Sequence, residues 1–360
     1  MINVTKTFLP PFEEYTAQVK RAWDKSWITN NGELVQELEQ KLKEYLGVKH
    51  LFFCTNGTIV LQMALKALHI SKEVITTPFS YVATTNAILW EGCTPVFADI
   101  EPDTFCIDPL KIEKVITENT EAILATHVYG FPCNIEAIEK IAQKYQLKVI
   151  YDGAHSFGCT YKNKSLLSYG DISTCSFHAT KLFHTVEGGC IICHDDELAN
   201  DLMLFRQFGH VGDDYFSLGI NGKNSEMHAA MGLAVLPYVQ AIIQERGEII
   251  KRYNNAFSLI GLYSPANASV DHLTWNNSYY PILFASEDEM LKVKTSLFNT
   301  GISLRRYFYP SLNKLKFIAP VVNCENAENI SSRVLALPLY PGLDESTQKK
   351  IIQAIVEIVQ

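Results

Sequence analysis

The stretch from Ser176 to Lys181 has the sequence SFHATK and is followed by the paired glycines Gly188 and Gly189. A solvated surface lysine needs no such setting of small and hydroxyl-bearing residues. A lysine that must lose its proton and form an imine does need such a setting, because crowding and nearby dipoles favour the neutral amine and restrict the motion of its side chain. Taken alone, the stretch also fits an ordinary loop lysine.

Two further stretches could supply the other parts of imine chemistry. Asn56-Gly57-Thr58 follows an apolar run and precedes a helical pattern, where free N–H groups can bind a phosphate. Asp152 follows another apolar run, so its carboxylate could face the protonated nitrogen of a bound pyridine ring. His155 could contact the same ring. Each has an ordinary alternative, because Asn-Gly is a common turn and an aspartate after a strand often caps a helix.

Short apolar runs that alternate with helical patterns must position these residues. The expected strands are 51–53, 74–76, 95–97, 122–124 and 149–151, and the expected helices between them are 34–46, 58–68, 81–91, 109–117 and 134–145. This alternation predicts an α/β fold with a mostly parallel sheet that binds ligands at the carboxyl ends of its strands. We expect a large domain over 1–237 and a smaller α+β domain over 238–360.

Composition narrows the class of protein. The 360 residues are 47% hydrophobic and 19% charged, which is typical of a soluble globular protein. The net charge of −8 argues against a nucleic-acid binder, and no membrane span or secretory signal is apparent, so we expect a cytoplasmic protein. Cys190 and Cys193 form a CxxC, but they stand in an apolar run without a second ligand pair, so we expect no metal.

A lysine, an acid and a phosphate-binding turn are together the requirements of pyridoxal 5′-phosphate (PLP). Their order along the chain fits fold-type I PLP enzymes, and the sequence resembles the DegT/DnrJ/EryC1/StrS family of nucleotide-sugar aminotransferases. The stretches that carry the resemblance are TNGTIVLQMAL (55–65), TPFSYVATTNAILWEG (77–92), YDGAHSFG (151–158), SFHATKLFHTVEGG (176–189) and GINGKNSEMHAAMGL (219–233).

The resemblance implies a role for each residue in the chemistry. Lys181 would bind the cofactor covalently and carry the proton, Asp152 would pair with the ring nitrogen, and His155 would contact the ring on its oxygen side. Tyr81 would stack on the ring, although without the resemblance the sequence indicates a core aromatic or an aromatic at the start of a helix. The implied phosphate contacts are Gly57, Thr58 and Ser176.

Asn221 matches an asparagine that in this family reaches the phosphate from the neighbouring subunit, which implies a homodimer. The following Gly222-Lys223-Asn224 departs from the family's more usual residue-Arg-Met. A turn residue between Gly219 and Gly222 is the alternative for Asn221.

The implied reaction moves an amino group from L-glutamate, which leaves as 2-oxoglutarate, to a nucleotide-linked keto sugar. Relatives that dehydrate sugars carry histidine where Lys181 stands, which favours the aminotransferase branch. The segments 8–11, 27–32, 74–79, 219–223 and 305–310 resemble a subgroup that acts on dTDP-4-keto-6-deoxy-D-glucose for surface polysaccharides such as the O-antigen of lipopolysaccharide. A 3-keto sugar acceptor is the alternative.

Arg305 and Arg306 could bind the nucleotide's pyrophosphate, with Tyr309 as a further substrate contact, although a solvated basic pair fits the sequence equally well. Two other classes of function are less favoured. A PLP-binding regulator without turnover would keep the same lysine. A nucleotide-sugar oxidoreductase would need a GxGxxG after a strand, which this sequence lacks.

Overall fold

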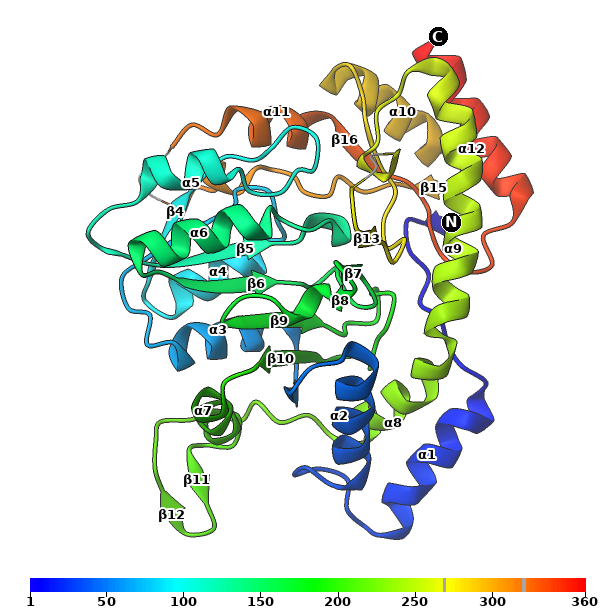
Figure 1. Ribbon diagram of the computed structural model, residues 1–360. Coiled ribbons are helices and arrows are strands. Elements are labelled where there is room, and N and C mark those ends of the chain that lie inside the picture. Colours follow the sequence, from blue (N-terminus) through cyan, green and yellow to red (C-terminus); the bar gives the residue numbers. More distant parts are fainter. Residues whose placement is uncertain (268–269, 319–321) are drawn as a thin grey trace.

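The computed structural model describes residues 1–267, 270–318 and 322–360, and its centre is a seven-stranded sheet with the order β2-β10-β9-β6-β5-β3-β4 (Figure 1). The strands are β2 (His50–Cys54), β3 (Glu73–Thr76), β4 (Thr94–Phe97), β5 (Thr120–Thr126), β6 (Lys148–Asp152), β9 (Ile172–Ser176) and β10 (Gly189–Cys193). Neighbouring strands are parallel except at β10, which is antiparallel to both β2 and β9. The sheet is therefore mostly parallel, as expected, and Cys190 and Cys193 lie buried in its antiparallel strand.

Helices cover both faces of this sheet, as the alternating pattern predicts (Figure 1). They are α2 (Glu33–Leu46), α3 (Gly57–Ala67), α4 (Ala83–Trp90), α5 (Pro109–Val115), α6 (Ile135–Tyr145), α7 (Asp196–Arg206) and α8 (Glu226–Val235). Helices α5 and α6 share a core with Ile75 and Ile123, whereas α3, α4 and α7 share one with Val74 and Ala122. Successive strand residues thus face opposite layers of helices. The expected helices and strands up to residue 145 are confirmed to within two residues at each end.

The C-terminal part has a core of its own. It is built from α9 (Val239–Phe257), β14 (Pro281–Leu283), α10 (Glu287–Asn299), β16 (Val334–Ala336) and α12 (Glu345–Val359). The expected boundary near residue 238 falls at a single 3₁₀ turn, Leu236–Tyr238, between α8 and α9.

Two segments cross that boundary. Strand β1 (Ile2–Asn3) pairs with β15 (Ile302–Ser303), so the first residues of the chain join the C-terminal part rather than the large one. In the other direction, Phe308 and α11 (Glu325–Arg333) pack into the core of the large part. The division at residue 238 therefore stays a prediction.

Within the described residues, one helical stretch, Glu226–Ile260, is long and apolar enough by length and composition to cross a membrane. Of its most apolar window, 56% is buried inside the protein. Ala230 and Ile242 contribute to the core beneath α2, so the stretch packs as a core helix.

Candidate active site

The carboxyl ends of the parallel strands open on a cavity of about 270 Å³. Strands β2 and β9 run in the same direction because each is antiparallel to β10, so residues that follow β2, β3, β6 and β9 meet at one edge. The cavity is lined by eight of the sequence-predicted residues: Gly57, Thr58, Tyr81, Asp152, His155, Ser176, Lys181 and Arg305.

Lys181 lies in the loop that connects β9 to β10. The loop is closed by backbone hydrogen bonds, from Phe177 N–H to Gly188 O (2.8 Å) and from Lys181 N–H to His178 O (2.8 Å). Phe177 is fully buried in the core under α2, which anchors the start of the loop. The Nζ atom of Lys181 lies 3.5 Å from the hydroxyl of Tyr279. The sequence around the lysine therefore holds its amine at the cavity.

Asp152, the last residue of β6, is only 6% exposed. Its Oδ2 accepts a hydrogen bond from Thr84 Oγ1 (2.7 Å), and its Oδ1 accepts one from Ala154 N–H (3.1 Å). Burial raises the pKa of Asp152, whereas the bonds from Thr84 and Ala154 and the charge of Lys181 oppose that rise. Two fixed donors therefore hold the carboxylate at the cavity wall.

His155 is buried beside Asp152, and its Nδ1 accepts a hydrogen bond from Tyr129 N–H (3.1 Å). Its ring stacks on Phe308 at 5.6 Å between centroids, and Tyr279 meets it edge-on at 4.8 Å. Burial, and secondarily the charge of Lys181, lowers the pKa of His155 well below its ordinary value. The ring is therefore neutral with its proton on Nε2, where it can donate a hydrogen bond.

The turn before α3 has the form that an anion site requires. Asn56 caps the helix, because its Oδ1 accepts hydrogen bonds from Thr58 N–H (3.0 Å) and Ile59 N–H (2.9 Å). A Cβ on Gly57 would lie 2.8 Å from the Cβ of Ser176, so only glycine lets the turn pack against the end of β9. The hydroxyls of Thr58 and Ser176 line the cavity beside the positive end of the helix dipole.

Several residues that line the cavity were not predicted from the sequence. Tyr279, Tyr307 and Phe308 come from the C-terminal part, and His178 and Glu187 come from the lysine loop. The aromatic runs at 279–280 and 307–309 are visible in the sequence, but no spacing rule connects them to Lys181, which lies about a hundred residues earlier.

Three predicted residues do not line the cavity. Arg306 forms an ion pair with Glu287 (2.7 Å), donates a hydrogen bond to Ser332 O (2.6 Å) and stacks on the ring of Tyr309. The structure therefore gives this pair a packing role away from the cavity and does not support it as a substrate contact. Asn221 is exposed and pairs with Gln207 in an isolated β-bridge.

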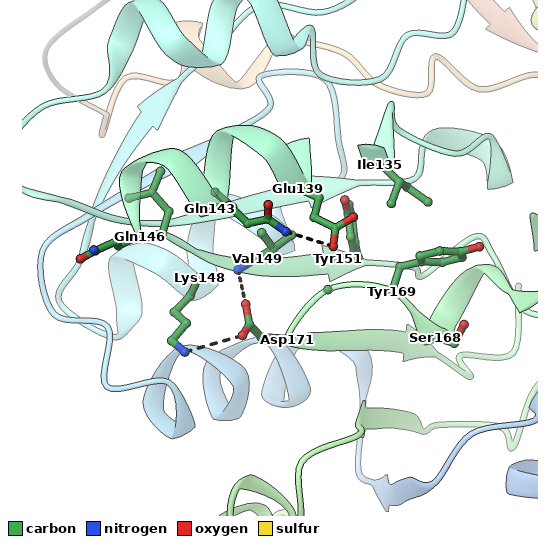
Figure 2. Close-up of a pocket in the computed structure, with 13 residues that line it drawn as sticks. Ile135, Glu139, Gln143, Gln146, Lys148, Val149, Tyr151, Ser168, Tyr169 and Asp171 are labelled. Atoms are coloured by element: carbon green, nitrogen blue, oxygen red, sulfur yellow. Dashed lines mark hydrogen bonds and ion pairs between the residues drawn. The ribbon is translucent and has the colours of Figure 1, made fainter. Parts of the chain in front are cut away.

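A larger hollow, of about 620 Å³, lies at the other end of the strands (Figure 2). There Asp171 accepts the N–H of Val149 (2.8 Å) and forms an ion pair with Lys148 at the start of β6 (3.6 Å). These charged groups already have partners, and the lysine, acid and phosphate turn all face the opposite edge. We therefore assign the chemistry to the smaller cavity.

The residues around that cavity fit PLP. Lys181 would supply the amine, buried Asp152 would supply a carboxylate for the ring nitrogen, and the α3 turn with Ser176 would supply the phosphate site. When bound, the cofactor accepts the electron pair left on a substrate carbon after proton removal. The chain would contribute the proton carrier, the counter-charge and the anchors.

Comparison with known proteins agrees with this arrangement. Residues 12–356 match the DegT/DnrJ/EryC1/StrS aminotransferase family. The chain is 41% identical to dTDP-4-amino-4,6-dideoxy-D-glucose transaminase from Shigella dysenteriae, over 99% of both chains, and 32% identical to UDP-2-acetamido-2-deoxy-3-oxo-D-glucuronate aminotransferase from Pseudomonas aeruginosa, over 90% of both. Its fold superposes on the crystal structure of DesI in the presence of its TDP-sugar product with a TM-score of 0.93 and 29% identity, over 99% of this chain and 93% of that one. The chain therefore belongs to the DegT/DnrJ/EryC1/StrS family, and it is a PLP-dependent nucleotide-sugar aminotransferase.

Proposed function

We propose that the protein transfers the amino group of L-glutamate to dTDP-4-keto-6-deoxy-D-glucose and so makes dTDP-4-amino-4,6-dideoxy-D-glucose. The observation that carries this proposal is the 41% identity, over nearly the whole chain, to the transaminase named for that product. We further propose that it acts in the cytoplasm and supplies a surface polysaccharide such as the O-antigen.

The residues of the cavity divide the work of the reaction. Lys181 Nζ would carry the proton from the donor carbon to the cofactor in the first half-reaction and would make the reverse transfer, to the sugar carbon, in the second, and the Tyr279 hydroxyl 3.5 Å away would help to orient it. Asp152 would hold the charge of the ring nitrogen, and the neutral His155 would donate from Nε2 to the ring oxygen.

A product analysis tests the proposal. The PLP-loaded protein is incubated with L-glutamate and either the dTDP-4-keto or a dTDP-3-keto 6-deoxyhexose, and NMR locates the new amine. We expect an amine at C4 and little conversion of the 3-keto sugar. Amination at C3 alone would replace the proposal by the 3-keto alternative, which the similarity to the 3-oxo-glucuronate enzyme favours. A protein that binds PLP but aminates neither sugar would point to a regulator.

Arg305 lines the cavity, and we propose that it binds the pyrophosphate of the sugar nucleotide. Its guanidinium lies 4.9 Å from the centroid of the Tyr307 ring, and its backbone is held by a β-bridge to Ala336. We expect Arg305→Gln to raise the KM for the sugar nucleotide about 10- to 100-fold with little change in kcat, because a hydrogen bond to a charged group contributes about 1.5–3 kcal/mol.

Arg306→Gln is the matched control for Arg305→Gln. Because Arg306 is held by Glu287 and Ser332 outside the cavity, its loss should lower the melting temperature and leave the KM unchanged. Steady-state kinetics of both variants measures the KM for the sugar nucleotide, and thermal unfolding measures their melting temperatures. An equal rise in KM for the two variants would contradict the assignment of Arg305.

We propose that the enzyme is a homodimer in which Asn221 reaches the partner's phosphate site. Asn221 is exposed, but the segment around it is fixed, because Thr55 N–H donates to Gly222 O (3.0 Å) and Asn224 Nδ2 donates to Cys54 O (3.1 Å). Next to it projects the hairpin of β11 (His210–Val211) and β12 (Asp214–Tyr215) (Figure 1). Six large apolar side chains in and beside this hairpin are exposed: Phe208, Val211, Tyr215, Phe216, Leu218 and Ile220. A second copy of the chain would cover them.

Mixing two inactive or weakened variants tests this shared site. In a dimer of one Lys181→Ala chain and one Asn221→Ala chain, a trans contribution leaves one complete site and one doubly defective site. We therefore expect activity to reappear when the two variants are refolded together, to about one quarter of the wild-type value for random pairing. If Asn221 acts within its own chain, every mixed site is defective and no activity returns.

A further inference from the structure

A row of buried hydroxyl groups ends on the carboxylate of Asp152. Thr126 Oγ1 donates a hydrogen bond to Ser80 Oγ (3.2 Å), Ser80 Oγ lies 2.7 Å from Thr84 Oγ1, and Thr84 Oγ1 donates to Asp152 Oδ2 (2.7 Å). None of the three hydroxyl residues is more than 2% exposed. They come from the end of β5, the loop after β3 and helix α4, so the row joins three separate elements.

The direction of the row follows from the number of protons. An ionised carboxylate only accepts hydrogen bonds, so Thr84 gives its one hydroxyl proton to Asp152. Thr84 must then accept from Ser80, and Ser80, having used its proton, must accept from Thr126. All three O–H dipoles therefore point toward Asp152, and hydrogen bonds aligned in this way strengthen one another.

The row fixes one of the two carboxylate oxygens. Ala154 N–H holds Oδ1 (3.1 Å) and Thr84 holds Oδ2 (2.7 Å), so the carboxylate plane has a single orientation. Asp152 lines the cavity, and its remaining acceptor positions are available there to a ring N–H. Without Thr84, one oxygen would lose its donor and the carboxylate could rotate.

We propose that Thr84, supported by Ser80 and Thr126, is a positioning residue that orients the Asp152 carboxylate as the acceptor for the cofactor's ring nitrogen. Electrostatics agrees with the geometry, because the Thr84 hydroxyl is the largest influence that opposes the rise in the pKa of Asp152 on burial. Titratable groups around Asp152 include Lys181, the neutral His155 and the Cys175 thiol of β9, and the same cavity is lined by Tyr81, His178, Glu187, Tyr279, Arg305 and Tyr307.

Two neighbouring threonines of α4 provide a matched pair of variants. Thr84→Val removes the hydroxyl that bonds to Asp152 and keeps the side-chain shape. Thr85→Val makes the same change one residue further on, where the fully buried Oγ1 has no hydrogen-bond partner among the described residues. Thr84→Ser keeps a hydroxyl and should rescue the function. Each variant is assayed for PLP dissociation constant, for the pH dependence of bound-cofactor absorbance, and for the rate of the glutamate half-reaction.

We expect Thr84→Val to weaken PLP binding several-fold and to slow the half-reaction about 10- to 100-fold, with Thr85→Val and Thr84→Ser close to wild type. Loss of the donor raises the pKa of Asp152, so the acid-side change in absorbance should begin at a higher pH. Equal behaviour of Thr84→Val and Thr85→Val, or failure of Thr84→Ser to rescue, would overturn the proposal.

Ser80→Ala keeps the proposal testable if Thr84→Val does not fold. It breaks the row one step earlier and leaves Thr84 in contact with Asp152, so we expect a smaller effect of the same sign on the pH titration of the bound cofactor. A titration identical to that of the wild type would overturn the role of the row, whether or not the enzyme transfers amino groups to the proposed sugar.

Discussion

Replacing Lys181 with alanine is expected to reduce transamination by at least about 10⁴-fold. The loss combines the proton transfer, typically a factor of about 10²–10⁴, with the loss of the covalent route that the amine provides. The protein should still fold and bind PLP, because Asp152 and the Gly57 turn are untouched. Formation of 2-oxoglutarate from L-glutamate measures the effect.

Lys164→Ala is the control for the Lys181 variant. Lys164 is exposed on strand β8 (Lys164–Ser165), away from the cavity, and its loss should leave the rate unchanged. A Lys181→Ala protein that transaminates at the wild-type rate would show that another group carries the proton.

Asp152→Asn is expected to lower kcat between about 10²- and 10⁴-fold, because loss of one member of a buried charge pair costs about 3–5 kcal/mol. The amide keeps the size of the side chain but not the charge that would hold a proton on the ring nitrogen. The rate of the glutamate half-reaction, measured at saturating PLP, separates this effect from weaker cofactor binding.

The same substitution should not destabilise the cofactor-free protein. Burial raises the pKa of Asp152, so the folded state binds its proton more tightly than the unfolded state does. Ionisation of Asp152 therefore costs stability as pH rises from its ordinary pKa through the raised value. At neutral pH we expect the cofactor-free Asp152→Asn protein to be at least as stable as wild type, and a clear loss in urea unfolding would contradict this.

The sequence predicts the parts of the site that depend on local pattern. Apolar runs with flanking helices place Asp152 and Asn56-Gly57-Thr58 at strand ends, and parallel strands bring those ends to one edge. The Asn56-Gly57-Thr58 turn is likewise a local pattern, because it stands between an apolar run and a helix. These features could be inferred before any contact between distant residues was known.

Features that depend on distant contacts could not be predicted in this way. Arg305 and Arg306 are adjacent and look equivalent in the sequence, but the extended backbone at Arg305, bridged to Ala336, sends successive side chains to opposite sides. One therefore reaches the cavity and the other reaches Glu287. Thr84 looked like an ordinary helical residue, and only the folded chain brings it to Asp152.

We propose that Lys181, Asp152 and the α3 turn form one PLP-dependent transamination site. Its most direct test is a single-turnover half-reaction, in which PLP-loaded protein is mixed with L-glutamate while absorbance and 2-oxoglutarate are followed together. We predict a yellow protein whose cofactor band shifts on addition of glutamate, with one 2-oxoglutarate released per bound cofactor. A cofactor band unchanged by glutamate, with no 2-oxoglutarate formed, would contradict the assignment.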